Sequence, residues 1–404
     1  MGVFIFVLAL SVVLQGCYDD SYSGASPDGG EADAPVQVLV EVGDPMQNKG
    51  SVVENIAKEG GRNIYVYAFS KDMLTSFEYK ASDDEINTLI DGSVDIPGTK
   101  AGRRAVTSAE GGALTWADAS KVKCYHSGEL RNISYDFYAY HKGDINVEES
   151  RIVRTQDAVM LDLEIDGSQD LMSAKAELTG EQLVCFDAEE QKRLRDYSYS
   201  YYSGARGVLP KFYFKHHLVR LDFELVPGFV AGEVKNVTVL GIEVESKYKC
   251  RFTVAEKSHP SQQGVTFSES DAAENYRSFS LREKDGSFIK DGAYRLQTLT
   301  SQSELPEVMP VGGSLLVAPQ KDSLTAYVTM KQTRQDGSVI AHARNRVILK
   351  YTKGTGYGSF DAGNKYKVKL LVYGVTTVNT TVEVEPWLSG GNASLDGESD
   401  KPEL

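Results

Sequence analysis

The chain has 404 residues, and 43 Lys and Arg against 57 Asp and Glu give a formal net charge of −14 at pH 7. This charge repels nucleic-acid phosphates, so we expect no nucleic-acid partner. Hydrophobic residues make up 41% of the chain, which excludes disordered and collagen-like classes. At about 100 to 200 residues per domain, the length predicts about two domains.

The first 16 residues are predicted to be a lipoprotein signal peptide. Residues 3–14 form an apolar run that is too short to cross a hydrocarbon core of about 30 Å and is typical of a signal-peptide core. The run leads to Leu14-Gln15-Gly16-Cys17, which resembles the lipobox of bacterial lipoproteins. This resemblance implies cleavage between Gly16 and Cys17 and a lipid on Cys17. No Lys or Arg precedes the apolar run, which departs from the usual pattern.

Residues 17–35 are predicted to be an acidic flexible tether that follows the lipidated cysteine. Residues 18–35 contain five acidic residues, no basic residue and no aliphatic residue larger than Ala. Asp19 and Asp20 resemble the acidic signal that sends some lipoproteins to the outer face of the outer membrane. We therefore expect a surface-exposed outer-membrane lipoprotein, anchored to the membrane through Cys17.

No motif in the sequence indicates catalysis, a cofactor or a metal site, so we expect no enzyme. The six histidines show no metal-binding spacing, and no GxSxG motif occurs. Besides Cys17, the chain contains Cys124, Cys185 and Cys250, an odd number without a CxxC spacing. Within one molecule these three thiols can form at most one disulfide, and buried free thiols are the alternative.

Alternating apolar residues predict strands along most of the chain. Residues 36–42 place valine at every second position, and residues 63–69, 133–140 and 158–166 repeat that character. Residues 187–195 predict one of the few short helices. We expect residues 36–207 to form an N-terminal β-sandwich.

A tyrosine-rich stretch, residues 196–207, contains no core-forming aliphatic residue and is expected to be the domain boundary. It is either an ordinary packing loop or an adhesive surface. Further short strands separated by Gly and Asp-Gly turns predict a C-terminal β-sandwich over residues 208–388, followed by a polar tail over residues 389–404. The predicted fold class is all-β, with two tandem sandwiches and minor helix.

Four segments in order resemble strands of the fimbrillins, the type V pilins. They are residues 215–223 (KHHLVRLDF), 135–140 (YDFYAY), 360–366 (FDAGNKY) and 381–387 (TVEVEPW). The resemblance covers roughly residues 17–390 and implies transthyretin-like sandwich domains with Greek-key character. It also implies that a trypsin-like protease removes the first strand at the cell surface. Another fimbrial subunit then donates its C-terminal strand to the exposed groove, by β-strand exchange.

In this sequence the strand to be displaced would carry Val36, Val38, Val40 and Val42. The family's cleaved bond follows an Arg shortly after that strand, whereas here the candidates are Lys49 and Arg62. The protease accepts Lys49, or cuts at Arg62, or leaves the strand in place, as the resemblance implies for an anchoring subunit.

A donor strand should alternate apolar and polar residues, whereas residues 388–404 are polar and glycine-rich and look like a poor donor. The alternative donor is the closing strand, with Val382, Val384 and Trp387. A subunit that accepts a strand without donating one would cap the tip. We therefore favour a tip or accessory fimbrial subunit that adheres to a ligand on a host or bacterial surface. The alternatives are an anchor subunit and a lipid-anchored glycan-binding protein that stacks sugars on Tyr197–Tyr202.

Overall fold

The computed structural model describes eleven stretches of the chain. They are residues 34–42, 61–72, 74–78, 86–92, 100–107, 114–118, 123–143, 145–231, 234–257, 264–301 and 305–387. The signal peptide, the lipidation site at Gly16 and Cys17, the cleavage candidate Lys49 and the polar tail lie outside these residues. In the described stretches, no helix is long and apolar enough to span a membrane.

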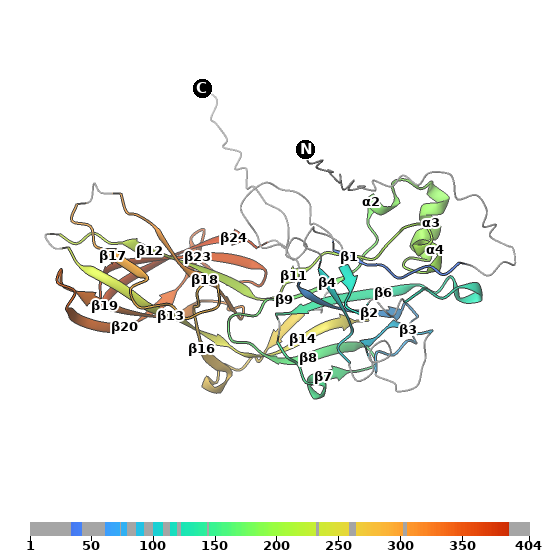
Figure 1. Cartoon of the computed structure of the whole chain (residues 1–404), viewed down its shortest axis with the longest axis horizontal. Helices are drawn as coiled ribbons and strands as arrows, with labels where there is room; N and C mark the ends of the chain where they lie inside the picture. Colours follow the sequence, from blue (N-terminus) through green and yellow to red (C-terminus); the bar gives the residue numbers. More distant parts are fainter. Residues whose placement is uncertain are drawn as a thin grey trace, which may run out of the picture.

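Strands dominate the fold, which confirms the all-β prediction (Figure 1). Three short α-helices gather at the end of the molecule away from the second sandwich: α2 (Gly180–Leu183), α3 (Ala188–Asp196) and α4 (Tyr201–Gly204). The helix predicted over residues 187–195 corresponds to α3, which begins after Asp187. The Asp187 side chain caps this helix by accepting a hydrogen bond from the Glu190 N–H at 2.8 Å.

A seven-stranded sheet packs on a four-stranded sheet in the first sandwich. The larger sheet has the order β11 (Lys215–His216), β9 (Leu171–Lys175), β6 (Tyr135–Lys142), β2 (Asn63–Ser70), β4 (Arg103–Thr107) and β5 (Leu114–Trp116), with β3 (Thr88–Ile90) also on β2. The smaller sheet has the order β15 (Gly264–Phe267), β14 (Lys249–Glu256), β8 (Ala158–Glu164) and β7 (Ile152–Arg154). Tyr140 and Phe252 meet edge to face between the two sheets, with ring centroids 6.0 Å apart.

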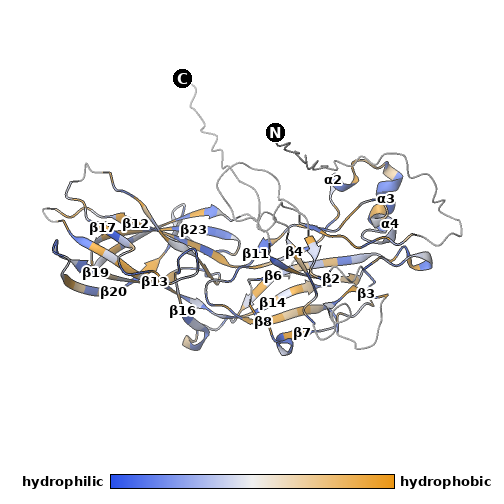
Figure 2. Ribbon diagram, in the orientation of Figure 1, coloured by the Kyte–Doolittle hydropathy of each residue, from blue (hydrophilic) through white to orange (hydrophobic). Residues whose placement is uncertain are grey.

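The second sandwich packs a four-stranded sheet on a five-stranded one. The first has the order β18 (Met309–Val317), β12 (Val219–Pro227), β23 (Asn364–Gly374) and β24 (Thr377–Pro386). The second has the order β16 (Tyr276–Ser280), β13 (Asn236–Lys247), β19 (Leu324–Thr333) and β20 (Val339–Leu349), with β17 (Tyr294–Gln297) also on β13. Apolar and polar residues alternate along these strands (Figure 2), so one face of each sheet reaches the core.

Several smaller elements complete the described fold. They are β1 (Glu41–Val42), which pairs with β10 (Lys211–Phe212), the hairpin of β21 (Tyr351–Lys353) and β22 (Gly356–Gly358), and the 3-10 turns η1 (Gly128–Leu130), η2 (Glu149–Arg151) and η4 (Ala273–Asn275).

The chain crosses between the sandwiches without a linker. A single residue, Tyr248, separates β13 of the second sandwich from β14 of the first. Strands β14 and β15 follow residue 207 in sequence, yet they extend the sheet of β7 and β8, which precede it. One apolar cluster continues through both sandwiches. The division into residues 36–207 and 208–388 stays a prediction. It did not include the return of β14 and β15, which follow residue 207, to the sheet of β7 and β8.

Candidate functional site

Residues 36–42 lie on the outer face of the seven-stranded sheet. The Val38 and Val40 side chains are 1% and 4% exposed, whereas that of Leu39 is 49% exposed. The two valines belong to a cluster that we call the outer cluster. Its members are Val38, Val40, Ile64, Val66, Ala68, Leu89, Ile90, Tyr125, Tyr135, Phe137, Ala139, Met172, Ala174, Ala176, Tyr199, Phe212 and Phe214. The valine alternation therefore places one face of the segment on apolar side chains.

The same segment takes part in little regular sheet. Only Glu41 and Val42 form a ladder, parallel to β10, and Gln37 forms an isolated bridge with Cys124. The Val38 N–H donates to the Lys123 carbonyl at 2.8 Å, and the Glu41 N–H donates to the Pro210 carbonyl at 2.9 Å. The Tyr125 N–H also donates to the Val36 carbonyl at 2.9 Å, and Trp116 Nε1 donates to the Val38 carbonyl at 3.1 Å. Valine burial and scattered backbone bonds, without a continuous ladder, hold this segment in place.

The cleavage candidate Arg62 is built into the seven-stranded sheet. Its N–H donates to Thr107 Oγ1 at 3.0 Å, and its carbonyl accepts from the Thr107 N–H at 3.1 Å. The following residue, Asn63, begins β2 opposite Val106. A protease that needs an extended, unpaired substrate would have to separate the start of β2 from β4 to reach the bond after Arg62.

The closing strand β24 is held very differently from residues 36–42. It pairs with β23 along its whole length, from Asn364 opposite Pro386 to Gly374 opposite Thr377. On the inner face Val382 is 9% exposed and Val384 packs against the main core. Backbone pairing and apolar burial thus act together on this strand.

Ion pairs link β24 to β23 on the outer face of the same sheet. Lys365 Nζ lies 2.5 Å from Glu385 Oε2, and Lys369 Nζ lies 2.6 Å from Glu383 Oε1. Lys367 Nζ lies 3.3 Å from Glu385 Oε1. The hydrogen bond from Lys365 lowers the pKa of Glu385. Each pair is partly exposed and contributes little alone, but together they favour this partner and register.

The residue after β24, Trp387, is 4% exposed and stacks on His216 of β11. The ring centroids lie 3.7 Å apart at an interplanar angle of 17°. His216 Nδ1 in turn lies 2.9 Å from Asp170 Oδ1. Because β11 pairs with β9 of the first sandwich, this stack fixes the end of the second sandwich's closing strand to the first sandwich. No local sequence pattern predicts the contact of His216 with Asp170.

The adjacent residue His217 points the other way, as expected for neighbours on a strand. Its Nε2 lies 2.8 Å from Ser173 Oγ, and its ring lies near Phe252. Burial, reinforced by the neighbouring His216, lowers the pKa of His217 to about 4. His216 is therefore buried and His217 half-buried, on opposite faces of the strand.

The tyrosine-rich segment turns key rings inward. Tyr199 is 1% exposed within the outer cluster. Tyr202 is 8% exposed, its ring centroid lies 3.7 Å from the Arg206 guanidinium, and its hydroxyl donates to Glu190 Oε2 at 2.7 Å. Ser200 and Ser203 form a reciprocal cap that starts α4 where a loop was expected. These two rings pack inside the molecule and are not available to stack on a sugar.

The three cysteines in the described part of the chain are free thiols: Cys124 is half-buried, Cys185 is exposed and Cys250 is buried. Burial raises the pKa of the Cys250 thiol to about 12, so this thiol stays protonated. Within the described stretches, no group of three or more His, Cys, Asp or Glu side chains could hold a metal ion.

Comparison with known proteins gives solved structures only, since no family model and no curated protein match the chain. A putative cell adhesion protein from Bacteroides uniformis is 15% identical, with a TM-score of 0.44, over 89% of this chain and 100% of its own. One from Bacteroides ovatus is 12% identical, with a TM-score of 0.44, over 89% and 99%. The tip fimbrial protein Mfa3 from Porphyromonas gingivalis, with a C-terminal truncation, is 10% identical, with a TM-score of 0.35, over 87% and 100%. Two of these three structural neighbours are thus described as putative cell adhesion proteins and the third as a fimbrial tip protein.

Proposed function

We propose that this chain is a tip or accessory subunit of a surface fimbrium that accepts a strand from a neighbouring subunit and does not donate its own. The observation that carries this proposal is the contrast between the two terminal segments. Residues 36–42 rest on the outer cluster with a two-residue ladder, whereas β24 is paired along its full length, linked by ion pairs and stacked through Trp387.

Loss of residues 36–42 would uncover an apolar surface that cannot stay open in water. Val38 and Val40 are almost fully buried, and burial of each such side chain is worth about 1.5–3 kcal/mol. A partner strand with apolar residues at alternate positions would restore this burial and the backbone bonds together. Neighbouring subunits that offer such a strand are therefore the expected partners.

The closing strand would stay in place because its removal exposes Val382 and Trp387 and breaks a complete ladder. A subunit with an open groove and a retained closing strand ends a fibre. This position suits contact with a ligand on another cell or host surface.

Maturation would follow the route that the N-terminal sequence favours. The chain would be exported as a lipoprotein, lipidated on Cys17 and held at the outer membrane until a trypsin-like protease cuts between the tether and β2. Because Arg62 is engaged with Thr107, we propose Lys49 as the cleaved residue.

An anchor subunit is the second candidate. In this alternative residues 36–42 are never released, and the nearly complete burial of Val38 and Val40 is the observation that favours it. The two candidates differ in whether the protein matures by cleavage.

A peptide-exchange experiment tests the proposal. Because Lys58 is a further tryptic site between residues 42 and 63, a parent chain with Lys58→Ala and its Lys49→Ala and Arg62→Ala variants are treated with a trypsin-like protease, and a labelled peptide of sequence VQVLVEV is added. Native mass spectrometry should show peptide uptake only after cleavage, in the parent and in Arg62→Ala but not in Lys49→Ala. A control peptide with aspartate in place of its second and third valines should not bind. Absence of uptake by the cleaved parent would contradict strand acceptance.

A further inference from the structure

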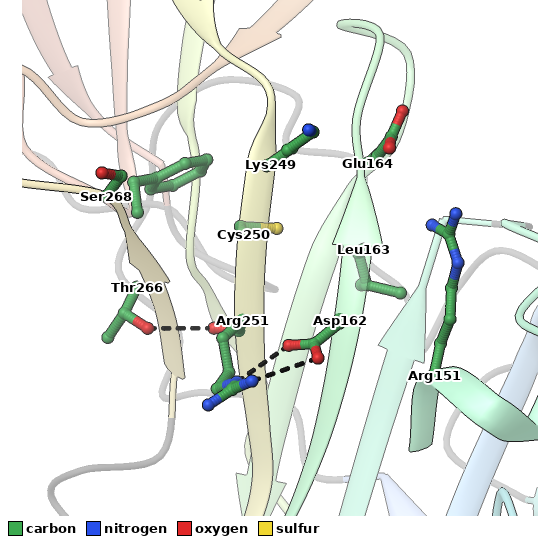
Figure 3. Close-up of a pocket in the computed structure, with 10 residues that line it drawn as sticks. Arg151, Asp162, Leu163, Glu164, Lys249, Cys250, Arg251, Thr266 and Ser268 are labelled. Atoms are coloured by element: carbon green, nitrogen blue, oxygen red, sulfur yellow. Dashed lines mark hydrogen bonds and ion pairs between the residues drawn. The ribbon is translucent and has the colours of Figure 1, made fainter. Parts of the chain in front are cut away.

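A charged groove lies on the outer face of the β15-β14-β8-β7 sheet of the first sandwich, next to the point where the chain crosses between the sandwiches (Figure 3). Its volume is about 510 Å³, within the range of sites that hold small ligands. Outward side chains of β8, β14 and β15 form its floor, and Arg151 reaches in from η2 at one side. The proposed strand exchange takes place on the other sheet and does not use this groove.

The carboxylates of the groove already have cationic partners. Arg251 holds Asp162 through two bonds, Nε to Oδ1 at 2.8 Å and Nη2 to Oδ2 at 3.1 Å. Glu164 lies 3.4 Å from Arg277 Nη1, which reaches it from β16. These pairs neutralise the acidic side chains of the floor and fix their orientation.

Two cationic side chains at the groove, Arg151 and Lys249, form no ion pair with the carboxylates of its described lining residues. In the part of the chain that the structure describes, neither Arg151 nor Lys249 is paired with a carboxylate, and both are exposed. They stand on opposite sides of the outward row of β8 in Figure 3. A surplus of positive charge at this point of a chain with net charge −14 selects an anionic group.

The remaining outward lining is polar. Thr266 and Ser268 carry exposed hydroxyl groups, whereas the buried Leu163 and Cys250 and the half-buried Phe267 belong to or pack against the core. A pyranose ring presents hydroxyl groups at its edge, which can form hydrogen bonds with these two side chains. A carboxylate on that ring would meet Arg151 or Lys249.

We propose that this groove binds an acidic saccharide, a sugar ring that carries a carboxylate. This inference goes beyond the proposed strand acceptance and does not depend on it, because the groove is complete in the uncleaved chain.

Calorimetry on the uncleaved full chain tests it, with tetragalacturonate as the probe. The matched control probe is the fully methyl-esterified tetramer, which keeps the rings and loses the charges. We expect saturable binding of the acid and at least roughly tenfold weaker binding of the ester, since a charge-assisted hydrogen bond accounts for such a factor.

Two charge-matched double variants locate the site. Arg151→Ala with Lys249→Ala should weaken binding at least roughly tenfold. Lys321→Ala with Lys353→Ala removes the same charge from exposed positions outside the groove and should leave binding within about twofold. If the first pair disturbs folding, Arg151→Gln alone supplies the same comparison.

Several outcomes would overturn the proposal. These are no saturable binding of the acid, equal binding of the ester, equal loss in both double variants, or equal binding of hexaglutamate, which would make the groove a peptide site. Because neither protease nor peptide exchange enters this assay, its failure would leave strand acceptance unaffected, and the reverse holds as well.

Discussion

Substitution of Trp387 by alanine should release the end of the closing strand. The indole is 4% exposed and stacks on His216, at the point where β24 leaves its sheet. Its Nε1 atom has no hydrogen-bond partner in the described structure, so the substitution removes packing without breaking a hydrogen bond. The effect should therefore report the apolar contact between the closing strand and the first sandwich.

The magnitude follows from burial. Truncation of a buried tryptophan to alanine costs about 3–5 kcal/mol, and the position at the end of β24 favours the lower limit because neighbours can relax into the space. A loss of about 3 kcal/mol corresponds to a roughly 150-fold larger equilibrium constant for opening of the strand. Trp387→Phe keeps a ring on His216 and should lose only about 1 kcal/mol.

Hydrogen exchange with peptide resolution is the suitable assay, because it separates local opening from global unfolding. In the Trp387→Ala variant the loss of protection should be confined to Thr377–Pro386 and to the amides of β23 that face it, with β12 little changed. If amides of β24 exchange within threefold of the parent rate, the stack does not hold the strand. If they already exchange rapidly in the parent, the strand is not locked at all.

Three other sites give further expectations. Val38→Ala with Val40→Ala should lower the free energy of unfolding by about 2 kcal/mol per valine. The double variant should also bind more of a dye specific for apolar surface. An unchanged dye signal would mean that the segment does not cover the outer cluster. The pKa of His217 lies at about 4 in the folded chain and near 6.5 in the unfolded chain, so the unfolded state takes up the proton first as the pH falls. The neutral imidazole therefore contributes up to about 3 kcal/mol of stability above pH 6.5, and this contribution is lost as the pH falls from 6.5 to 4. Over this pH range the urea midpoint of the parent should decrease more than that of His217→Gln. Arg154 and Asp91 form a buried ion pair at 2.6 Å, so Arg154→Ala should leave a buried, unpaired aspartate and destabilise the chain by about 3–5 kcal/mol. Arg154→Met with Asp91→Leu removes both charges and should destabilise it less in the same urea titration. Equal losses in the two variants would show that the unpaired aspartate is not the cause.

Local sequence pattern was enough to predict most individual strands. Alternation of Val219, Leu221 and Phe223 with charged residues placed one face of β12 in the core, and the structure buries those three side chains. The same reasoning placed Val38 and Val40 on an apolar surface. These features depend only on neighbours two residues apart.

The pairings could not be predicted in this way, because the partners are distant in sequence. Val38 bonds to Lys123, and Glu41 bonds to Pro210 just before β10, so residues 36–42 contact segments that lie more than 80 residues away in the sequence. The contact of Trp387 with His216 joins residues 171 positions apart, and nothing local marks it. In the tyrosine-rich stretch, aromatic composition favoured an exposed loop, but the Ser200 and Ser203 cap and the outer cluster draw its rings inward.

Intact mass and N-terminal sequencing of the protein recovered from fimbriae test the central claim most directly, because they report both terminal segments at once. Strand acceptance at a fibre end predicts a chain that begins at Gly50 and keeps its residues through Trp387, with a separate subunit's strand on the outer cluster. A chain that still begins at lipid-modified Cys17 in cells with an active protease would contradict it, since residues 36–42 would then never leave the groove.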